Sequence, residues 1–242
     1  MGYYSGKLMG MQAEAVSGIV TDGLKLYLDA SNPASYPGSG TTWFDLSGNC
    51  NNGTMVGGVT PLSNAMQFDG VDDYVDFGNI LNIENGDFSY SLWATLRTPG
   101  LKGIFCKSIY GDVAGRWTIY QEYGNIVCLA QGIADSNILY ISSTPYINTG
   151  FHLFTVTINR AGNMILYIDG VQIASVVLSN PTYNMATTGR LFAGAYGDSN
   201  GSAPQAGLFN NCDINDIMVY RKNLTANEVT QNFHATKSKY GF

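Results

Sequence analysis

The chain has 242 residues, of which 45% are hydrophobic and 12% are charged, and its formal net charge at pH 7 is −6. A chain of this length is long enough for one all-β domain with a sizeable core. The negative charge disfavours nucleic-acid binding, which requires a basic patch. No run of about 18 apolar residues is present to span a membrane, and the N-terminus lacks the apolar core of a secretory signal.

The four cysteines are widely spaced, at Cys50, Cys106, Cys128 and Cys212. No C-x-x-C pair or Cys/His cluster occurs, which disfavours structural zinc. We expect reduced thiols that are mostly buried.

Residues 1–22 show no sustained hydrophobic period, which predicts an arm or a linker. An isolated arm would leave its apolar side chains in water, so we predict that it contacts a partner. The predicted contact residues are Tyr3, Tyr4, Leu8, Met9 and Met11. The alternative is a disordered terminus.

A domain is predicted from residue 23 to residue 242. Leu24, Leu26 and Leu28 alternate with polar or aromatic residues, which predicts a half-buried strand. Similar runs recur to residue 220, and Gly, Asn, Asp or Pro separates nearly all of them, as is typical of an all-β sandwich or barrel. Asp169 and Gly170 lie between two alternating apolar runs and predict a type I′ hairpin turn.

One helix is predicted, over residues 225–237. Thr225 and Glu228 have the spacing of a capping box, and Val229 and Phe233 form an apolar i, i+4 pair. The pair is expected to pack against the sandwich.

The stretch "FDGVDDYVDFGN", residues 68–79, concentrates four of the chain's 18 acidic residues. Alternation places Val75 and Phe77 in the core and turns Asp76 toward solvent. Asp69 and Asp72 flank a turn, which Asp favours because its side chain bonds nearby backbone N–H groups. The stretch is therefore either an acidic turn or a site for a hard cation, which takes carboxylate and carbonyl oxygens.

Four segments resemble the laminin-G-like domains of the concanavalin A-like lectin/glucanase superfamily. They are "GLKLYLDASNPASYPGSGTTWFDLSGNCNNGTMVGG", "AMQFDGVDDYVDFGN", "LYIDGVQIA" and "INDIMVYRKNLTANEV". The tail "VTQNFHATKSKYG" is similar to endings of such domains in tailed-phage structural proteins. The resemblance implies an all-β, two-sheet antiparallel jelly roll, but this fold carries many functions.

The hydrolases of this superfamily place two carboxylates on one strand face, usually as E-x-D-x-x-E. The chain has four Glu, at Glu14, Glu84, Glu122 and Glu228, and none belongs to such a motif. His152 and His234 have no nucleophile motif beside them. We therefore expect that the protein is not an enzyme.

In superfamily relatives calcium often lies where the first and last strands meet the turn of the second strand pair. Carried over by position, the resemblance implies calcium ligands at Asp29, Asp69 and Asp216. Asp45 is an alternative calcium ligand, although the sequence "DLSG" favours an Asx-type turn at this position.

Sugars stack on exposed aromatic faces, while Asn, Asp and backbone groups bind their hydroxyls. Two loops contain these residue types. The candidate glycan-binding residues are Tyr110, Asp112, Trp117, Tyr196, Asp198 and Asn200. Trp117 alternates with Ile119, which favours a core position for it.

The sequence thus predicts a non-enzymatic virion surface protein, either capsid decoration or a tail or fibre component, folded in host cytoplasm. Its expected partners are other virion subunits, its own symmetry mates or cell-surface glycans. A stand-alone carbohydrate-binding module of an extracellular cellular protein is the alternative. An unrecognised glycosidase is the third hypothesis.

Overall fold

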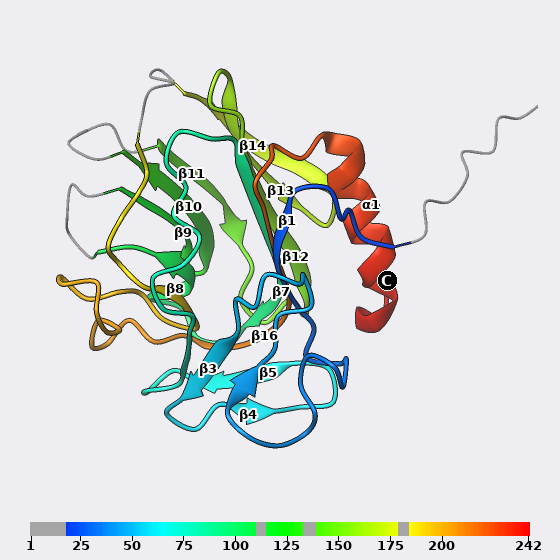
Figure 1. The fold of residues 1–242 in the computed structure, drawn as a ribbon, viewed down its shortest axis with the longest axis vertical. Helices are drawn as coiled ribbons and strands as arrows, with labels where there is room; N and C mark the ends of the chain where they lie inside the picture. Colours follow the sequence, from blue (N-terminus) through cyan, green and yellow to red (C-terminus); the bar gives the residue numbers. More distant parts are fainter. Residues whose placement is uncertain (1–17, 110–114, 133–138, 179–183) are drawn as a thin grey trace, which may run out of the picture.

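The computed structural model describes residues 18–109, 115–132, 139–178 and 184–242. Within these ranges the strands form two antiparallel sheets of eight strands each. The sheets face each other as a sandwich, and one α-helix lies outside it (Figure 1). The predicted all-β sandwich with a C-terminal helix is confirmed.

The first sheet has the order β14 (Val171–Val177), β13 (Asn163–Ile168), β12 (His152–Ile158), β7 (Phe88–Leu96), β16 (Asn211–Tyr220), β5 (Met66–Asp69) and β4 (Thr60–Pro61), with β1 (Leu24–Leu28) also paired to β16. The second has the order β11 (Leu139–Pro145), β10 (Asn125–Gln131), β9 (Arg116–Glu122), β8 (Leu101–Lys107), β15 (Leu191–Ala193), β6 (Tyr74–Asp76), β3 (Gly53–Val56) and β2 (Thr42–Trp43). Strands from opposite ends of the chain therefore lie side by side, as in a jelly roll.

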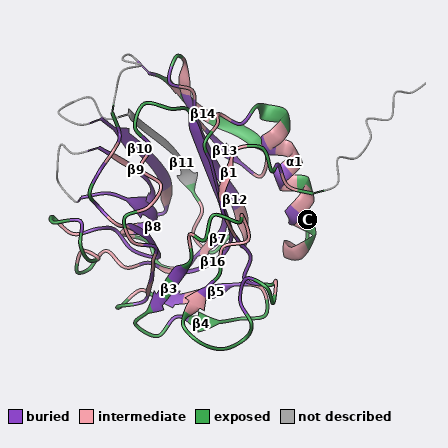
Figure 2. Ribbon diagram, in the orientation of Figure 1, coloured by how far each residue is buried: buried purple, intermediate pink, exposed green. Residues whose placement is uncertain are grey.

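The core lies between the sheets and is rich in aromatic rings. Trp117 is fully buried there, with its ring centroid 5.0 Å from that of Tyr90 and 5.7 Å from that of Phe105. Val75 and Phe77 also face this core, as alternation predicted. Buried residues follow the facing strands, whereas exposed residues gather on the loops, on strand β14 and at the start of α1 (Figure 2).

The hairpin between β13 and β14 turns at Asp169 and Gly170, whose φ angles are 53° and 80°. Both angles are positive, as a type I′ turn requires, so the predicted hairpin is confirmed. Gly170 also lies under the helix, because a Cβ built on it would be 3.5 Å from the Phe233 side chain.

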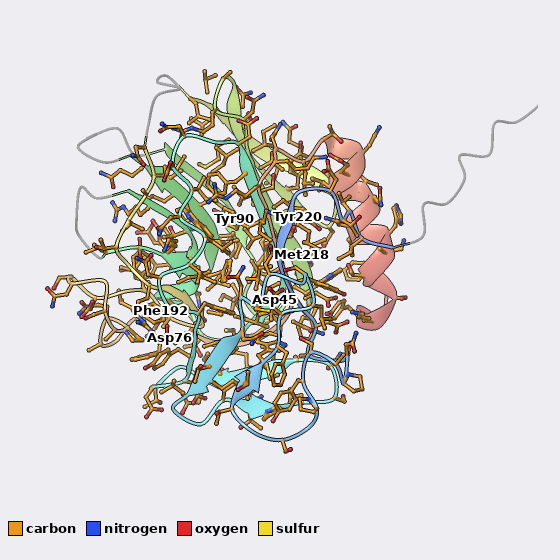
Figure 3. All side chains as sticks on the ribbon, viewed as in Figure 1. Asp45, Asp76, Tyr90, Phe192, Met218 and Tyr220 are labelled. Atoms are coloured by element: carbon orange, nitrogen blue, oxygen red, sulfur yellow. The ribbon has the colours of Figure 1, made fainter. Side chains whose placement is uncertain are left out.

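Helix α1 (Ala226–Thr236), followed by the 3₁₀ turn η1 (Lys237–Tyr240), covers the outer face of the first sheet. Thr225 and Glu228 form the predicted capping box. Val229 is fully buried in a second cluster with Trp93 and Tyr220, and Phe233 packs against that cluster. Tyr220 and Met218, from β16, lie toward the helix side of the sandwich (Figure 3). The predicted docking of the helix is confirmed.

The described part of the predicted arm, residues 18–22, lies against α1. The Val20 N–H donates to Oδ1 of Asn232 at 2.8 Å, and Gln231 donates to the carbonyl of Gly18 at 3.1 Å. Within the described ranges no helix is long and apolar enough to cross a membrane. All four cysteines are free, and three of them are buried, as predicted.

Candidate functional site

The acidic turn after β5 brings three carboxylates together. Ligand oxygens of Asp69, Asp72 and Asp73 lie within 4.8 Å of one another. The N–H of Asp69 donates to Asp73 Oδ2 at 3.0 Å. Burial raises the pKa of the Asp73 carboxyl, and the nearby charges of Asp69 and Asp72 add to this rise, against the opposing hydrogen bond. A cation would offset this repulsion, so the donor set fits a hard metal ion.

The calcium set expected from the resemblance is not assembled. Asp29 and Asp216 do meet, but they meet on the ammonium of Lys239, which is 2.7 Å from Asp29 Oδ2 and 2.9 Å from Asp216 Oδ1. Asp69 belongs to the acidic turn instead. The expected triad is therefore wrong as a set, because a lysine occupies the space between two of its members.

The rival Asp45 has a structural role. Its carboxylate accepts the N–H groups of Tyr27, Ser47 and Asn51, each at 2.9 Å. This is the Asx-type turn that the sequence predicted.

Two aromatic residues predicted to bind a glycan are not available at the surface. Trp117 is fully buried in the core, and Tyr196 is 4% exposed, with its ring packed edge-on against Tyr120 at 5.7 Å. Neither ring has a free face for a sugar, because the outer face of the second sheet packs around Tyr196 and the core encloses Trp117. These two assignments are wrong.

The other predicted residues divide into two groups. Asp198 organises its own loop, since its Oδ1 accepts the N–H groups of Asn200 and Ser202 at 3.1 and 3.0 Å. Asn200 is exposed on the same loop. The remaining predictions lie outside the described residues: Tyr110, Asp112, Tyr3, Tyr4, Leu8, Met9 and Met11.

A pocket of about 380 Å³ opens on the outer face of the first sheet, between β12, β13 and the start of α1. We call it the amide pocket. Thr157 and Ile165 are cross-strand neighbours in its wall, and Tyr167 and Leu224 are buried in it. Its remaining lining residues are Asn159, Gly162, Asn163, Asn223, Thr225 and Ala226.

The polar groups of the amide pocket are neutral. Asn159 accepts the Ala161 N–H at 3.0 Å through Oδ1, and Asn163 donates to Ser175 Oγ at 3.1 Å through Nδ2. Among the described residues no partner uses the other polar atom of either amide, or the side chain of Asn223. Each amide thus offers hydrogen-bonding capacity to a ligand.

The sequence did not reveal this pocket because its walls are about sixty residues apart in the chain and come together through the docking of α1. A partial signal was present. Asn159 and Asn163 flank the tight turn between β12 and β13, and Asn223 lies two residues before the helix cap Thr225.

A two-sheet antiparallel sandwich with one C-terminal helix defines a jelly roll of the lectin type. A laminin-G-type family model, described as the concanavalin A-like lectin/glucanases superfamily, matches residues 68–230. The chain belongs to this superfamily. No curated protein matches its sequence.

Solved structures with the same fold include the binding domains of clostridial toxins. The binding domain of Paraclostridial Mosquitocidal Protein 1 is 19% identical, with a TM-score of 0.63 over 88% of this chain and 52% of that one. The ligand-binding domain of botulinum neurotoxin serotype D, in complex with N-acetylneuraminic acid, is 17% identical, with a TM-score of 0.63 over 90% and 52%.

The binding domain of botulinum neurotoxin DC, in complex with rat synaptotagmin II, is 17% identical, with a TM-score of 0.64 over 89% and 52%. The chain therefore spans about half the length of these toxin domains. At this level of identity the likeness concerns the fold.

Proposed function

We propose that this chain is a non-enzymatic carbohydrate-binding module that takes a neutral sugar in the amide pocket. The observation that carries the proposal is the lining of that pocket, where amides and hydroxyls surround an apolar wall of Ile165, Tyr167 and Leu224. Membership of a superfamily that includes lectins supports sugar binding, and so does the complex of a toxin domain of the same fold with N-acetylneuraminic acid. That sugar is acidic, so the preference for a neutral sugar rests on the lining of the pocket alone.

The size and chemistry of the pocket favour a sugar residue. Its volume lies at the lower end of the range for small-molecule sites, roughly 300–1,000 Å³. Asparagine side chains both donate and accept, which matches the hydroxyls of a sugar. No carboxylate, ammonium or guanidinium group lines it, so a neutral ligand is favoured over an acidic one.

Binding without hydrolysis is proposed for the same reason. A glycosidase needs two carboxyl groups on either side of the scissile bond. The lining of the amide pocket contains neither Asp nor Glu.

The test is a glycan array followed by calorimetric titration of the sugars that bind. Asn163→Ala combined with Asn223→Ala should weaken binding about tenfold to a hundredfold, since two neutral hydrogen bonds are worth roughly 1–3 kcal/mol. Asn200→Ala, in the exposed loop predicted from the sequence, is the matched control and should bind as the parent does. Loss of binding in the control and not in the pocket variant would move the site to that loop. Release of reducing ends from a bound glycan would contradict the non-enzymatic part.

We also propose that the acidic turn holds calcium as a structural ion, through Asp69, Asp72 and Asp73. Their mutual distances and the raised pKa of Asp73 support this. The ion would neutralise charges that otherwise repel one another.

Two kinds of protein are proposed as the one that carries this module. We propose a virion surface protein, on the sequence similarity of the tail "VTQNFHATKSKYG" to endings in tailed-phage structural proteins. The alternative is a cellular extracellular protein. Stoichiometric incorporation into purified particles tests the first, and deletion of residues 2–20 tests whether the arm makes the attachment or mediates self-association.

A further inference from the structure

Two carboxylates meet where the first and last strands of the domain pair. Leu28 of β1 is opposite Ile217 of β16. The next residues along the two antiparallel strands are Asp29 and Asp216, so their side chains are neighbours. Asp216 is at a bulge in β16, with a φ of 39°, and its side chain is fully buried.

The group between the two carboxylates is the ammonium of Lys239. Its Nζ donates to Asp29 Oδ2 at 2.7 Å and to both carboxylate oxygens of Asp216, at 2.9 and 3.0 Å. The hydroxyl of Tyr27 is 3.4 Å from Asp29 Oδ2, and that of Tyr240 is 3.2 Å from Asp216 Oδ2. Oxygen groups thus surround a cationic centre, which is the arrangement that a hard metal ion takes.

The charges of this cluster do not cancel, because one ammonium faces two buried carboxylates. Burial raises the pKa of Asp216 to about 7, and the charge of Asp29 adds to this rise while Lys239 opposes it. Burial lowers the pKa of Lys239, but the two carboxylates outweigh it, and the net pKa is raised. The ammonium therefore stays charged.

The backbone around Lys239 is held by contacts that do not involve its ammonium. The Tyr240 ring stacks on Trp93 with centroids 4.1 Å apart, and Trp93 Nε1–H donates to Thr236 Oγ1 at 2.7 Å. A shortened side chain at position 239 would consequently leave the two carboxylates in place with nothing between them. Two buried carboxylates without a cation are costly, so such a protein would take up a proton, for which Asp216 has a pKa of about 7, or a replacement cation.

We propose that Asp29 and Asp216 form a cation site that the chain fills with its own Lys239, which thereby takes the place of a divalent ion. Because the ammonium is tethered beside the site, its effective concentration is high and it excludes a free metal ion. Removing the ammonium converts the pair into a site for a hard cation such as calcium. The inference rests on the fold and is independent of the proposed sugar binding.

Terbium luminescence tests this directly, because Tyr27 and Tyr240 adjoin the carboxylates and would sensitise a bound ion. All proteins carry Asp72→Asn, which weakens the acidic turn as a competing site. Lys239→Ala should bind terbium at least about tenfold more tightly than its parent, with calcium competing. Adding Asp216→Asn should abolish the gain. Lys237→Ala, which removes a lysine that lies over the Phe233 ring, is the matched control and should behave as the parent.

Two results would overturn the proposal. One is terbium binding by Lys239→Ala no tighter than that of its parent. The other is binding by the parent that disappears with Asp216→Asn, because the ammonium would then not exclude the ion. If Lys239→Ala fails to fold in EDTA, calcium should restore its melting transition but not that of the double variant, and failure to restore it would also count against the proposal.

Discussion

Asn232 ties three parts of the molecule together, and its removal should be costly. The residue is 1% exposed. Its Oδ1 accepts the Val20 N–H at 2.8 Å, and its Nδ2 donates to the Tyr220 hydroxyl at 3.0 Å. Asn232→Ala would leave both of these groups buried without that partner. A stranded buried polar group costs about 1–3 kcal/mol. The Tyr220 hydroxyl keeps a weak hydrogen bond to Met218 Sδ at 3.4 Å and is only partly stranded, so the free energy of unfolding should fall by about 2–4 kcal/mol.

The measurement is urea unfolding followed by tryptophan fluorescence, with the free energy obtained by linear extrapolation. His234→Ala, at an exposed position two residues along the same helix, is the control and should change stability by less than about 0.5 kcal/mol. Combining Asn232→Ala with Tyr220→Phe should cost less than the sum of the single variants, because the second change removes the hydroxyl that has lost the Asn232 donor.

Hydrogen exchange gives a local check on the same reasoning. The Val20 amide should lose protection in Asn232→Ala and keep it in His234→Ala. If the two variants have equal stability and equal Val20 protection, the argument that this side chain joins the N-terminal segment to the helix is wrong.

Three further outcomes are expected. If the acidic turn holds calcium, about a hundredfold excess over Kd should add about 2.7 kcal/mol of stability to the parent and much less to Asp72→Asn; a melting temperature insensitive to both EDTA and calcium would contradict this. Lys107 is fully buried, and its ammonium donates to Asn79 Oδ1 and to the Gly189 carbonyl. Burial lowers its pKa from 10.5 to about 7, so stability should rise by about 1 kcal/mol per pH unit from pH 7 toward 10.5. Lys107→Met should flatten this rise. Thr225→Ala removes the helix cap and should cost about 1 kcal/mol in thermal or urea unfolding, unlike a change at an exposed mid-helix position.

The parts of the fold that the sequence predicted depend on local signals. The turn at Asp169 and Gly170 follows from a dipeptide that tolerates positive φ, and the helix ends follow from its capping box. Alternation placed Val75 and Phe77 correctly because a sheet with one buried face has a period of two.

The amide pocket and the cluster of Asp29, Asp216 and Lys239 could not be predicted in the same way, because they depend on departures from that period and on long-range contacts. Asp216 lies in the bulge of β16, where the register shifts between Asn215 and Met218, so simple alternation does not give the direction of its side chain. The meeting of Lys239 with Asp29 spans 210 positions of sequence. Tyr196 lies in a Gly- and Asn-rich region that looks exposed in sequence, yet its ring packs on Tyr120.

The C-terminal helix connects both proposals. Residues at its N-terminal end form one wall of the amide pocket, and the 3₁₀ turn at its other end delivers Lys239 to the two carboxylates. Because both ends depend on the same docked helix, a variant that loosens its middle, such as Asn232→Ala, should weaken sugar binding and at the same time make the carboxylate pair accessible to metal. Variants confined to one end should change one property and leave the other intact. On these two proposals the helix is part of the functional architecture as well as a cover for the first sheet.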